Sequence, residues 1–260
     1  MSLYTNYKNT KIHFTDQGKG SVVVLLHGFL ENLTMWNDIT PQIVKKNRVV
    51  CIDLLGHGKS ECHGYIHTME EMAEAVKAVL KKLRLRKVTL VGHSMGGYVA
   101  LAFADLFPDN VKGLCLMNST AQADSEEKRI NRDRAIVAVK QNYKTFVRIS
   151  IENLFRPKNR TLFKAQVDWV KKEALSTPLQ GIVAALEGMK IRVDREVVLR
   201  FAPYKKLLMI GKKDPVLNYD SLLEQVENTD IELIEFPDGH MSHIENKADF
   251  THNLLRFIEK

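Results

Sequence analysis

Short apolar runs alternate with longer helical patterns along the chain. The runs occupy residues 21–27, 48–54, 87–92, 111–117, 206–211 and 231–236. They lack a strict alternation of polar and apolar positions, which is typical of strands covered on both faces of a parallel sheet. Residues 11–16 alternate more regularly and indicate an antiparallel edge strand. The pattern predicts an α/β fold with a mostly parallel, twisted sheet flanked by helices.

Helical patterns fill the intervals between these runs. Residues 68–83 place apolar side chains on one helix face, and Thr68 followed by Glu71 fits a capping box. Residues 94–106 predict a helix that a proline stops, and residues 248–257 predict an amphipathic helix near the end of the sequence.

One long segment interrupts this rhythm. Between residues 119 and 202 no run is typical of a strand, and the sequence predicts helices near 124–140, 143–154, 160–174 and 179–189. A helical stretch of this length between two strands of a sheet forms an excursion above it. We therefore expect a core domain of residues 1–118 and 203–260, with residues 119–202 inserted as a helical cap.

Composition changes this picture little. The 260 residues are 45% hydrophobic, which is ordinary for a globular protein with a large core. The three cysteines have wide spacings and no CxxC pair, so neither a disulfide framework nor a zinc site is expected. Residues 1–11 lack the apolar stretch of a signal peptide, and no apolar run approaches the roughly 18 residues of a membrane span. The expected location is the cytoplasm.

The strongest chemical motif is Gly92-His93-Ser94-Met95-Gly96, between a predicted strand and a predicted helix. In this context G-x-S-x-G is a nucleophile elbow, a tight turn that lifts the serine hydroxyl clear of the sheet. The helix that follows directs free N–H groups and its positive dipole end toward developing negative charge. Ser94 is therefore the candidate nucleophile.

An earlier turn, His27-Gly28-Phe29, follows another predicted strand. A turn at this place presents a backbone N–H to an oxyanion, and the usual second donor is the N–H that follows the nucleophile. We therefore expect the amides of Phe29 and Met95 to form an oxyanion hole. His27 precedes the nucleophile in the chain and has a structural role available in the loop, so we do not expect it to be the base.

The order of nucleophile, acid and histidine in such sites places the base late in the chain. His240 lies in a Pro-Asp-Gly-His turn after the last predicted strand, and His243 is the nearest alternative. Asp214 follows the preceding strand and should lie beside that turn, where it would orient the imidazole. One strand earlier the chain offers no carboxylate before Asp124. The candidate triad is therefore Ser94, His240 and Asp214.

Positive charge is concentrated in the predicted cap. The formal net charge is +7, and residues 119–202 hold 17 Lys and Arg against 10 Asp and Glu, so the rest of the chain is balanced. Two interpretations stay open: a solvated surface, or a positive field over the active-site mouth that attracts anionic substrates or a membrane surface. Arg129, Arg132, Arg134 and Arg148 are candidate contributors to that field. No nucleic-acid motif occurs.

Taken together, the motifs resemble the α/β-hydrolase superfamily, in its lid-bearing, esterase-like branch. They are HGF at 27–29, DLLGHGKS at 53–60, GHSMGG at 92–97, and the late pair of Asp214 with Gly239-His240, in family order and over nearly the whole chain. The resemblance implies that the 53–60 loop is structural and that Glu245 fits the family pattern at the start of the last helix. A serine at position 94 argues against haloalkane dehalogenases and epoxide hydrolases, which use aspartate there.

The resemblance implies a serine hydrolase that acts on a small-molecule carboxylic ester through an acyl-enzyme, with no cofactor and no metal. Alternatives of the same fold stay open: perhydrolysis, carbon–carbon bond cleavage or elimination as in menaquinone-pathway enzymes, and a receptor-like hydrolase that binds a ligand and signals to a partner. We expect a small-molecule substrate, no nucleic acid and no membrane span, and the oligomeric state is open.

Overall fold

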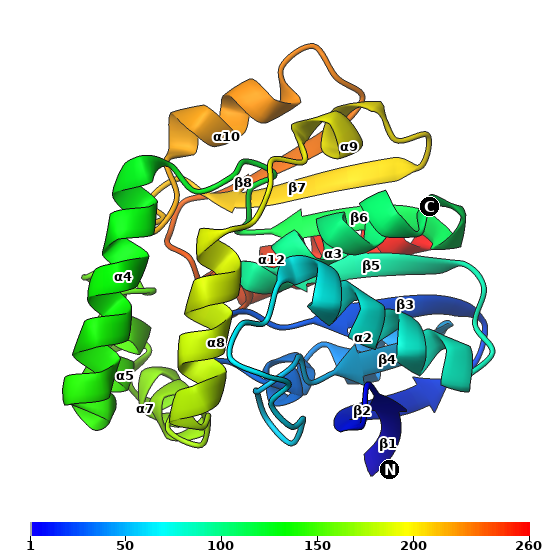
Figure 1. The fold of residues 1–260 in the computed structure, drawn as a ribbon. Coiled ribbons are helices and arrows are strands. Elements are labelled where there is room, and N and C mark those ends of the chain that lie inside the picture. Colours follow the sequence, from blue (N-terminus) through cyan, green and yellow to red (C-terminus); the bar gives the residue numbers. More distant parts are fainter. Residues whose placement is uncertain (1) are drawn as a thin grey trace.

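Eight strands form one sheet in the computed structural model, which describes residues 2–260 (Figure 1). They are β1 (Ser2–Tyr7), β2 (Thr10–Gly18), β3 (Ser21–Leu26), β4 (Asn47–Ile52), β5 (Val88–His93), β6 (Val111–Met117), β7 (Lys205–Gly211) and β8 (Glu232–Phe236). Their order is β1-β2-β4-β3-β5-β6-β7-β8, with β2 antiparallel to both neighbours and the other pairs parallel. The prediction of an α/β fold with a mostly parallel sheet is confirmed.

The amino-terminal edge of the sheet differs from the prediction. The strand expected at residues 11–16 is antiparallel, as predicted, but it is not the edge, because β1 pairs along its outer side. The β1 sequence SLYTNY is too polar to stand out as an apolar run. Backbone pairing with β2 and the packing of Leu3 and Tyr7 on the core hold it in place.

Helices cover both faces of the sheet (Figure 1). Apart from the helices within residues 126–190, they are η1 (Leu33–Trp36), α1 (Thr40–Ile43), α2 (Met69–Lys82), α3 (Met95–Leu106), η2 (Pro108–Asn110), α9 (Glu196–Phe201), which also lies between β6 and β7, α10 (Tyr219–Val226), α11 (Ser242–Glu245) and α12 (Lys247–Glu259). Val24 and Leu26 of β3 share an apolar cluster with α2 and α3, whereas Val23 and Leu25 share one with η1, α1 and α12. Successive strand residues point to opposite faces, so β3 is apolar throughout because it serves two cores. Within residues 2–260, no helix is both long and apolar enough to cross a membrane.

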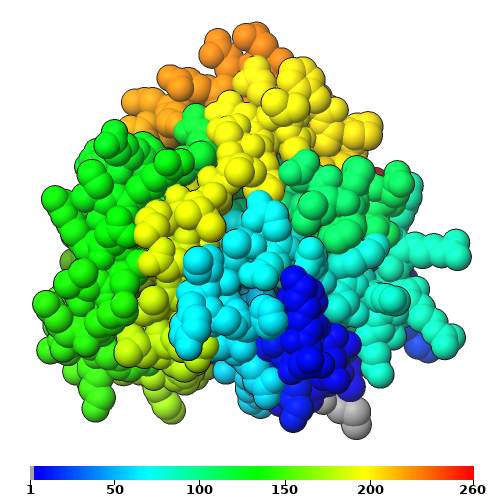
Figure 2. Space-filling view, viewed as in Figure 1, coloured from blue at the N-terminus to red at the C-terminus, as the bar shows by residue number. Residues whose placement is uncertain are grey.

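Residues 126–190, between β6 and β7, contain helices where the sequence predicts them, except that the single helix expected near 160–174 is divided into two helices. The helices are α4 (Glu126–Gln141), α5 (Tyr143–Glu152), α6 (Asn159–Leu162), α7 (Lys164–Ala174) and α8 (Leu179–Lys190). Figure 1 places α4, α5, α7 and α8 beside the carboxyl ends of the strands, and Figure 2 shows α4 and α8 packed against the rest of the molecule. The last part of the predicted cap, α9, packs against α3 of the core. The division of the chain into a core and a cap of residues 119–202 stays a prediction.

Candidate active site

Ser94 occupies the tight turn between β5 and α3. Its backbone has φ 49° and ψ −116°, a conformation that non-glycine residues rarely adopt. The Ser94 N–H donates to the carbonyl oxygen of Met117 at the end of β6 (2.9 Å), and the Ser119 hydroxyl donates to the Ser94 carbonyl (2.8 Å). These contacts hold the strained turn at the carboxyl end of the sheet.

The motif glycines leave room for this turn. A Cβ built on Gly92 would lie 2.3 Å from the carbonyl oxygen of Gly96, and one built on Gly96 would lie 2.4 Å from the carbonyl oxygen of Leu26. Both distances are far shorter than van der Waals contact. A side chain at Gly92 would therefore push α3 away from β5, and one at Gly96 would push α3 away from β3.

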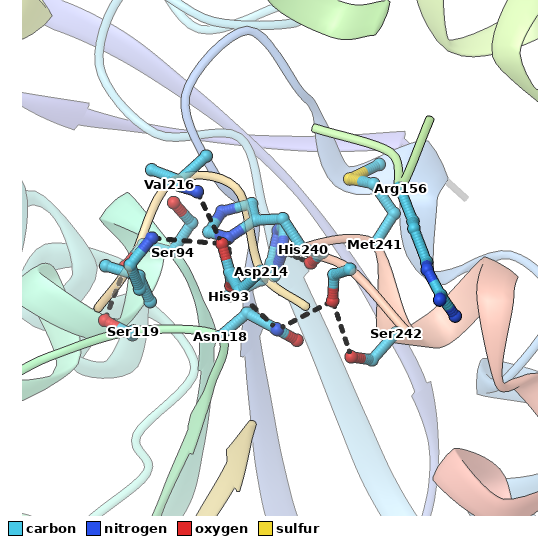
Figure 3. A network of polar contacts seen from close by, with 12 residues as sticks. His93, Ser94, Asn118, Ser119, Arg156, Asp214, Val216, His240, Met241 and Ser242 are labelled. Atoms are coloured by element: carbon cyan, nitrogen blue, oxygen red, sulfur yellow. Dashed lines mark hydrogen bonds and ion pairs between the residues drawn. The ribbon is translucent and has the colours of Figure 1, made fainter. Parts of the chain in front are cut away.

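The predicted base and acid meet at the ends of the last two strands. Asp214 follows β7 and His240 follows β8, and His240 Nδ1 lies 2.7 Å from Asp214 Oδ2 (Figure 3). The other carboxylate oxygen accepts the N–H groups of Val216 (2.8 Å) and Leu217 (3.1 Å). Burial alone would raise the pKa of Asp214, but attraction to His240 and these hydrogen bonds outweigh it and lower that pKa. Asp214 is thus an ionised partner at Nδ1, which leaves Nε2 of His240 available.

Ser94 and His240 line one small cavity. Its volume is about 80 Å³, and Figure 3 draws the Ser94 side chain next to the His240 ring. Four of its lining residues come from the helical insertion between β6 and β7: Arg132, Ser150, Leu154 and Met189. A larger hollow of about 450 Å³, between η1, α7 and α12, contains none of the predicted triad. Among residues 2–260, no group of three His, Cys, Asp or Glu side chains is arranged to hold a metal ion.

The two predicted oxyanion donors have free N–H groups. Phe29 follows β3 and lines the cavity, and Met95 is the first residue of α3. Neither backbone N–H has a hydrogen-bond acceptor within residues 2–260. The first N–H groups of a helix lack an intrahelical partner, which explains the free group at Met95. Their role in binding an oxyanion stays a prediction.

Asn118 is a site residue that the motif search missed. It directly follows β6 with φ 45°, and its Nδ2 donates to Asp214 Oδ2 (3.1 Å) and to the carbonyl oxygen of Gly239 (3.2 Å). It therefore links the acid to the loop that carries His240. In the sequence this position showed only the lack of a carboxylate, because no short motif marks an asparagine that bridges two distant loops.

A second buried pair of an acid and a histidine lies beside Ser94. His93 Nδ1 is 2.7 Å from Glu31 Oε2, which also accepts the Gly28 N–H (2.6 Å), and His93 Nε2 is 3.1 Å from the His240 carbonyl oxygen. Burial opposes both charges, but mutual attraction outweighs it, lowering the pKa of Glu31 to about 2 and raising the pKa of His93. The pair joins the Gly28 turn, the Ser94 turn and the His240 loop, and no sequence motif had indicated it.

Glu31→Gln should destabilise the fold most between about pH 4.5 and 6.5. The lowered pKa of Glu31 gives stability that is present above about 4.5 and is lost as the pH falls toward about 2. The raised pKa of His93 gives stability that is complete below about 6.5 and is lost as the pH rises through its folded value. Removing one partner of a buried pair costs about 3 kcal/mol. Urea unfolding from pH 3 to 9 measures the difference from wild type.

The matched control for this prediction is Glu127→Gln. Glu127 is an exposed residue of α4 with no ion-pair partner within residues 2–260. Its substitution should lower the free energy of unfolding by less than about 1 kcal/mol, because it removes only an exposed charge from the first turn of α4. A Glu31→Gln effect that is the same from pH 3 to 9 would contradict the assignment of a buried charged pair.

None of the alternative candidates for base and acid lines the cavity that contains Ser94. His27 is buried and its Nε2 accepts the N–H of Leu54 (2.9 Å), so it braces two loops. His243 packs against an imidazole and a phenyl ring and does not line the Ser94 cavity, and burial lowers its pKa to about 3. Asp124 pairs with two arginines of the cap.

Glu245 and the 53–60 loop brace the site. Glu245 ends the short α11, and its carboxylate accepts the N–H groups of Gly239 and Met241, on either side of His240, and the N–H of Arg156 in the cap. It thereby ties the loop of His240 to the helical insertion. In the 53–60 loop, both carboxylate oxygens of Asp53 accept backbone N–H groups, which closes the loop on itself and on the start of η1.

A family model described as the α/β hydrolase fold matches residues 21–179, which is more than half of the chain. The chain belongs to the α/β-hydrolase fold family. The matched range contains the Gly28 turn, the 53–60 loop and the Ser94 turn, in the order that the sequence motifs predict. The helical insertion of this α/β hydrolase begins within the same range.

Individual relatives of this α/β hydrolase have several activities. The dihydrolipoyllysine-residue acetyltransferase component of the acetoin cleaving system of Pseudomonas putida is 28% identical over 93% of the chain and 64% of that protein. The 2-hydroxy-6-oxo-2,4-heptadienoate hydrolase of P. putida is 36% identical over 42% of the chain and 41% of that enzyme. The chain thus spans 64% or less of these relatives' length. A malate-bound thermophilic esterase from Thermogutta terrifontis superposes with a TM-score of 0.92 at 28% identity, covering 100% of this chain and 98% of that one.

Proposed function

We propose that this α/β hydrolase cleaves small-molecule carboxylic esters through a triad of Ser94, His240 and Asp214. The observation that carries the proposal is the 2.7 Å contact between His240 Nδ1 and Asp214, with His240 lining the same cavity as Ser94. An ionised carboxylate at Nδ1 selects the imidazole tautomer whose Nε2 accepts a proton. Full-length similarity to the T. terrifontis esterase supports an ester as the substrate class.

In the proposed reaction, His240 Nε2 takes the hydroxyl proton of Ser94 as the serine oxygen bonds to the ester carbonyl carbon. The amides of Phe29 and Met95 donate to the oxyanion, each worth about 3 kcal/mol in the transition state. The carbon–oxygen bond then breaks, and the leaving alcohol takes the proton from His240. Water attacks the acyl-enzyme and gives a proton to His240, which returns it to Ser94 as the carboxylic acid leaves.

The cavity favours short substrates. Its volume of about 80 Å³ is well below the roughly 300–1,000 Å³ of sites for drug-sized ligands. We expect kcat/KM for methyl esters of straight-chain acids to be greatest at about two to four acyl carbons and to fall at least about tenfold by eight. A pH-stat measures acid release, with Ser94→Ala as background. A kcat/KM that rises with chain length would contradict the size argument, and no Ser94-dependent hydrolysis of any ester would contradict the function.

Cleavage of carbon–carbon bonds is the second candidate. Similarity to 2-hydroxy-6-oxo-2,4-heptadienoate hydrolase over 42% of the chain favours it, and the same triad can attack a ketone. Turnover of a ring-cleavage diketone and of a short methyl ester under one set of conditions separates the two reactions. We expect the ester to have the larger kcat/KM. A receptor-like role would show as near-single turnover of every short ester.

A further inference from the structure

The cap wall of the Ser94 cavity contains an arginine with free donors. Arg132 on α4 lines the cavity, and its Nε donates to Asp124 Oδ2 (3.0 Å). Its side chain is 20% exposed, and its two terminal nitrogens have no protein acceptor within residues 2–260. Asp124 therefore fixes the guanidinium at one nitrogen and leaves the planar fork available to a ligand.

Arg192 and Lys128 add positive charge beside Arg132. Arg192 is almost fully buried, pairs with the other oxygen of Asp124, and stacks on Tyr98 with its guanidinium carbon 4.1 Å from the ring centre. Its Nη2 is buried without an acceptor within residues 2–260. Burial, followed by repulsion from Arg192, lowers the pKa of Lys128. Asp124 pairs with both arginines, and Asp214 adds an attraction only at Lys128, so positive charge exceeds negative charge at this wall.

Two hydroxyl groups accompany the arginine. Tyr98 of α3 and Ser150 of α5 line the cavity with Arg132, and neither hydroxyl has a hydrogen-bond partner within residues 2–260. Most of the other lining groups outside the triad region are apolar: Phe29, Leu30, Leu154, Met189 and Val216. Polar donors that converge in an otherwise apolar cavity fix the orientation of a ligand.

We propose that Arg132, together with Tyr98 and Ser150, binds a carboxylate of the substrate, so that the preferred substrates are short esters that also carry a free carboxylate. The proposal rests on the proposed ester hydrolysis and deepens it. Carboxylates accept two parallel bonds from a guanidinium fork. The cavity of about 80 Å³ favours a carboxylate over a bulkier phosphate.

The positive charge of the cap therefore divides into two parts. Among the four arginines that the sequence offered as contributors to a field, Arg132 lines the cavity, whereas Arg129, Arg134 and Arg148 are exposed and do not line it. Much of the excess positive charge therefore lies on the solvated surface, whereas the cluster around Arg132 determines the substrate specificity.

Matched ester pairs test the proposal. Monomethyl malonate, succinate and glutarate place a carboxylate at increasing distance from the ester, and each has a neutral isostere with an amide end. Wild-type kcat/KM should favour the carboxylate in at least one pair by roughly 10- to 100-fold, the range of a charged hydrogen bond. Arg132→Gln should remove that preference by raising KM for the carboxylate esters, with a smaller loss on the amide esters. Arg129→Gln, an equal loss of charge on the same helix, should change neither.

Two results would overturn the carboxylate site. One is equal kcat/KM for both members of every pair, and the other is an equal loss on both members in Arg132→Gln. Calorimetric binding of the same esters to Ser94→Ala, with and without Arg132→Gln, needs no turnover. Arg132-dependent binding without hydrolysis in wild type would contradict ester hydrolysis and keep the carboxylate site. Hydrolysis of neutral esters without a carboxylate preference would contradict this site alone.

If Arg132→Gln lowers the thermal midpoint, a second variant keeps the test decisive. Arg132→Lys keeps the positive charge but loses the planar fork, and it should still reduce the preference for the carboxylate ester.

Discussion

Ser94→Ala should lower kcat for short methyl esters by at least about 10³-fold. The substitution removes the hydroxyl that would bond to the carbonyl carbon, and leaves only the contributions of the oxyanion donors and of substrate binding. The strained turn keeps its backbone contacts with Met117 and Ser119, so the fold should persist. A pH-stat measures kcat, and circular dichroism checks the fold.

Ser119→Ala is the matched control, because its hydroxyl contacts the backbone of the same turn and does not line the cavity. Losing one such hydrogen bond should cost less than about tenfold in kcat. If Ser94→Ala keeps more than a tenth of the wild-type kcat, Ser94 is not the nucleophile.

His240→Ala should be as damaging to kcat as Ser94→Ala, because it removes the group that takes the serine proton. The double variant should be no worse than either single variant, since a nucleophile and its base act as a unit. The three kcat values, measured on one ester, give the coupling directly.

His243→Ala is the control for this histidine. His243 lies three positions after His240, is buried against other aromatic rings and does not line the Ser94 cavity. Its loss should reduce the free energy of unfolding and leave kcat within about tenfold of wild type. Full kcat in His240→Ala with a large loss in His243→Ala would assign the base to His243.

Local patterns predicted most of the fold. The central strands are apolar on both faces, and the strand–turn–helix motif around Ser94 needs only adjacent residues to be recognised. Strand β1 lacked such a signal, because its stability comes from pairing with β2 rather than from an apolar sequence. For the same reason, β2 was placed at an edge that β1 occupies.

The parts of the site that the sequence did not reveal depend on contacts between distant residues. Glu31 and His93 are 62 positions apart, and Asn118 and Asp214 are 96 positions apart. A histidine within the nucleophile motif or an asparagine after a strand has no local pattern that names its partner. Arg132 was one of several arginines in a basic segment, and only the packing of α4 over the cavity distinguishes it.

Labelling with a fluorophosphonate tests the central assignment most directly. This probe reacts with an activated serine hydroxyl to form a stable adduct, and peptide mass spectrometry locates the modified residue. In wild type we expect one adduct, on Ser94, and no adduct in Ser94→Ala. Labelling of another residue in wild type, or undiminished labelling of Ser94→Ala, would contradict the assignment of Ser94 as the nucleophile.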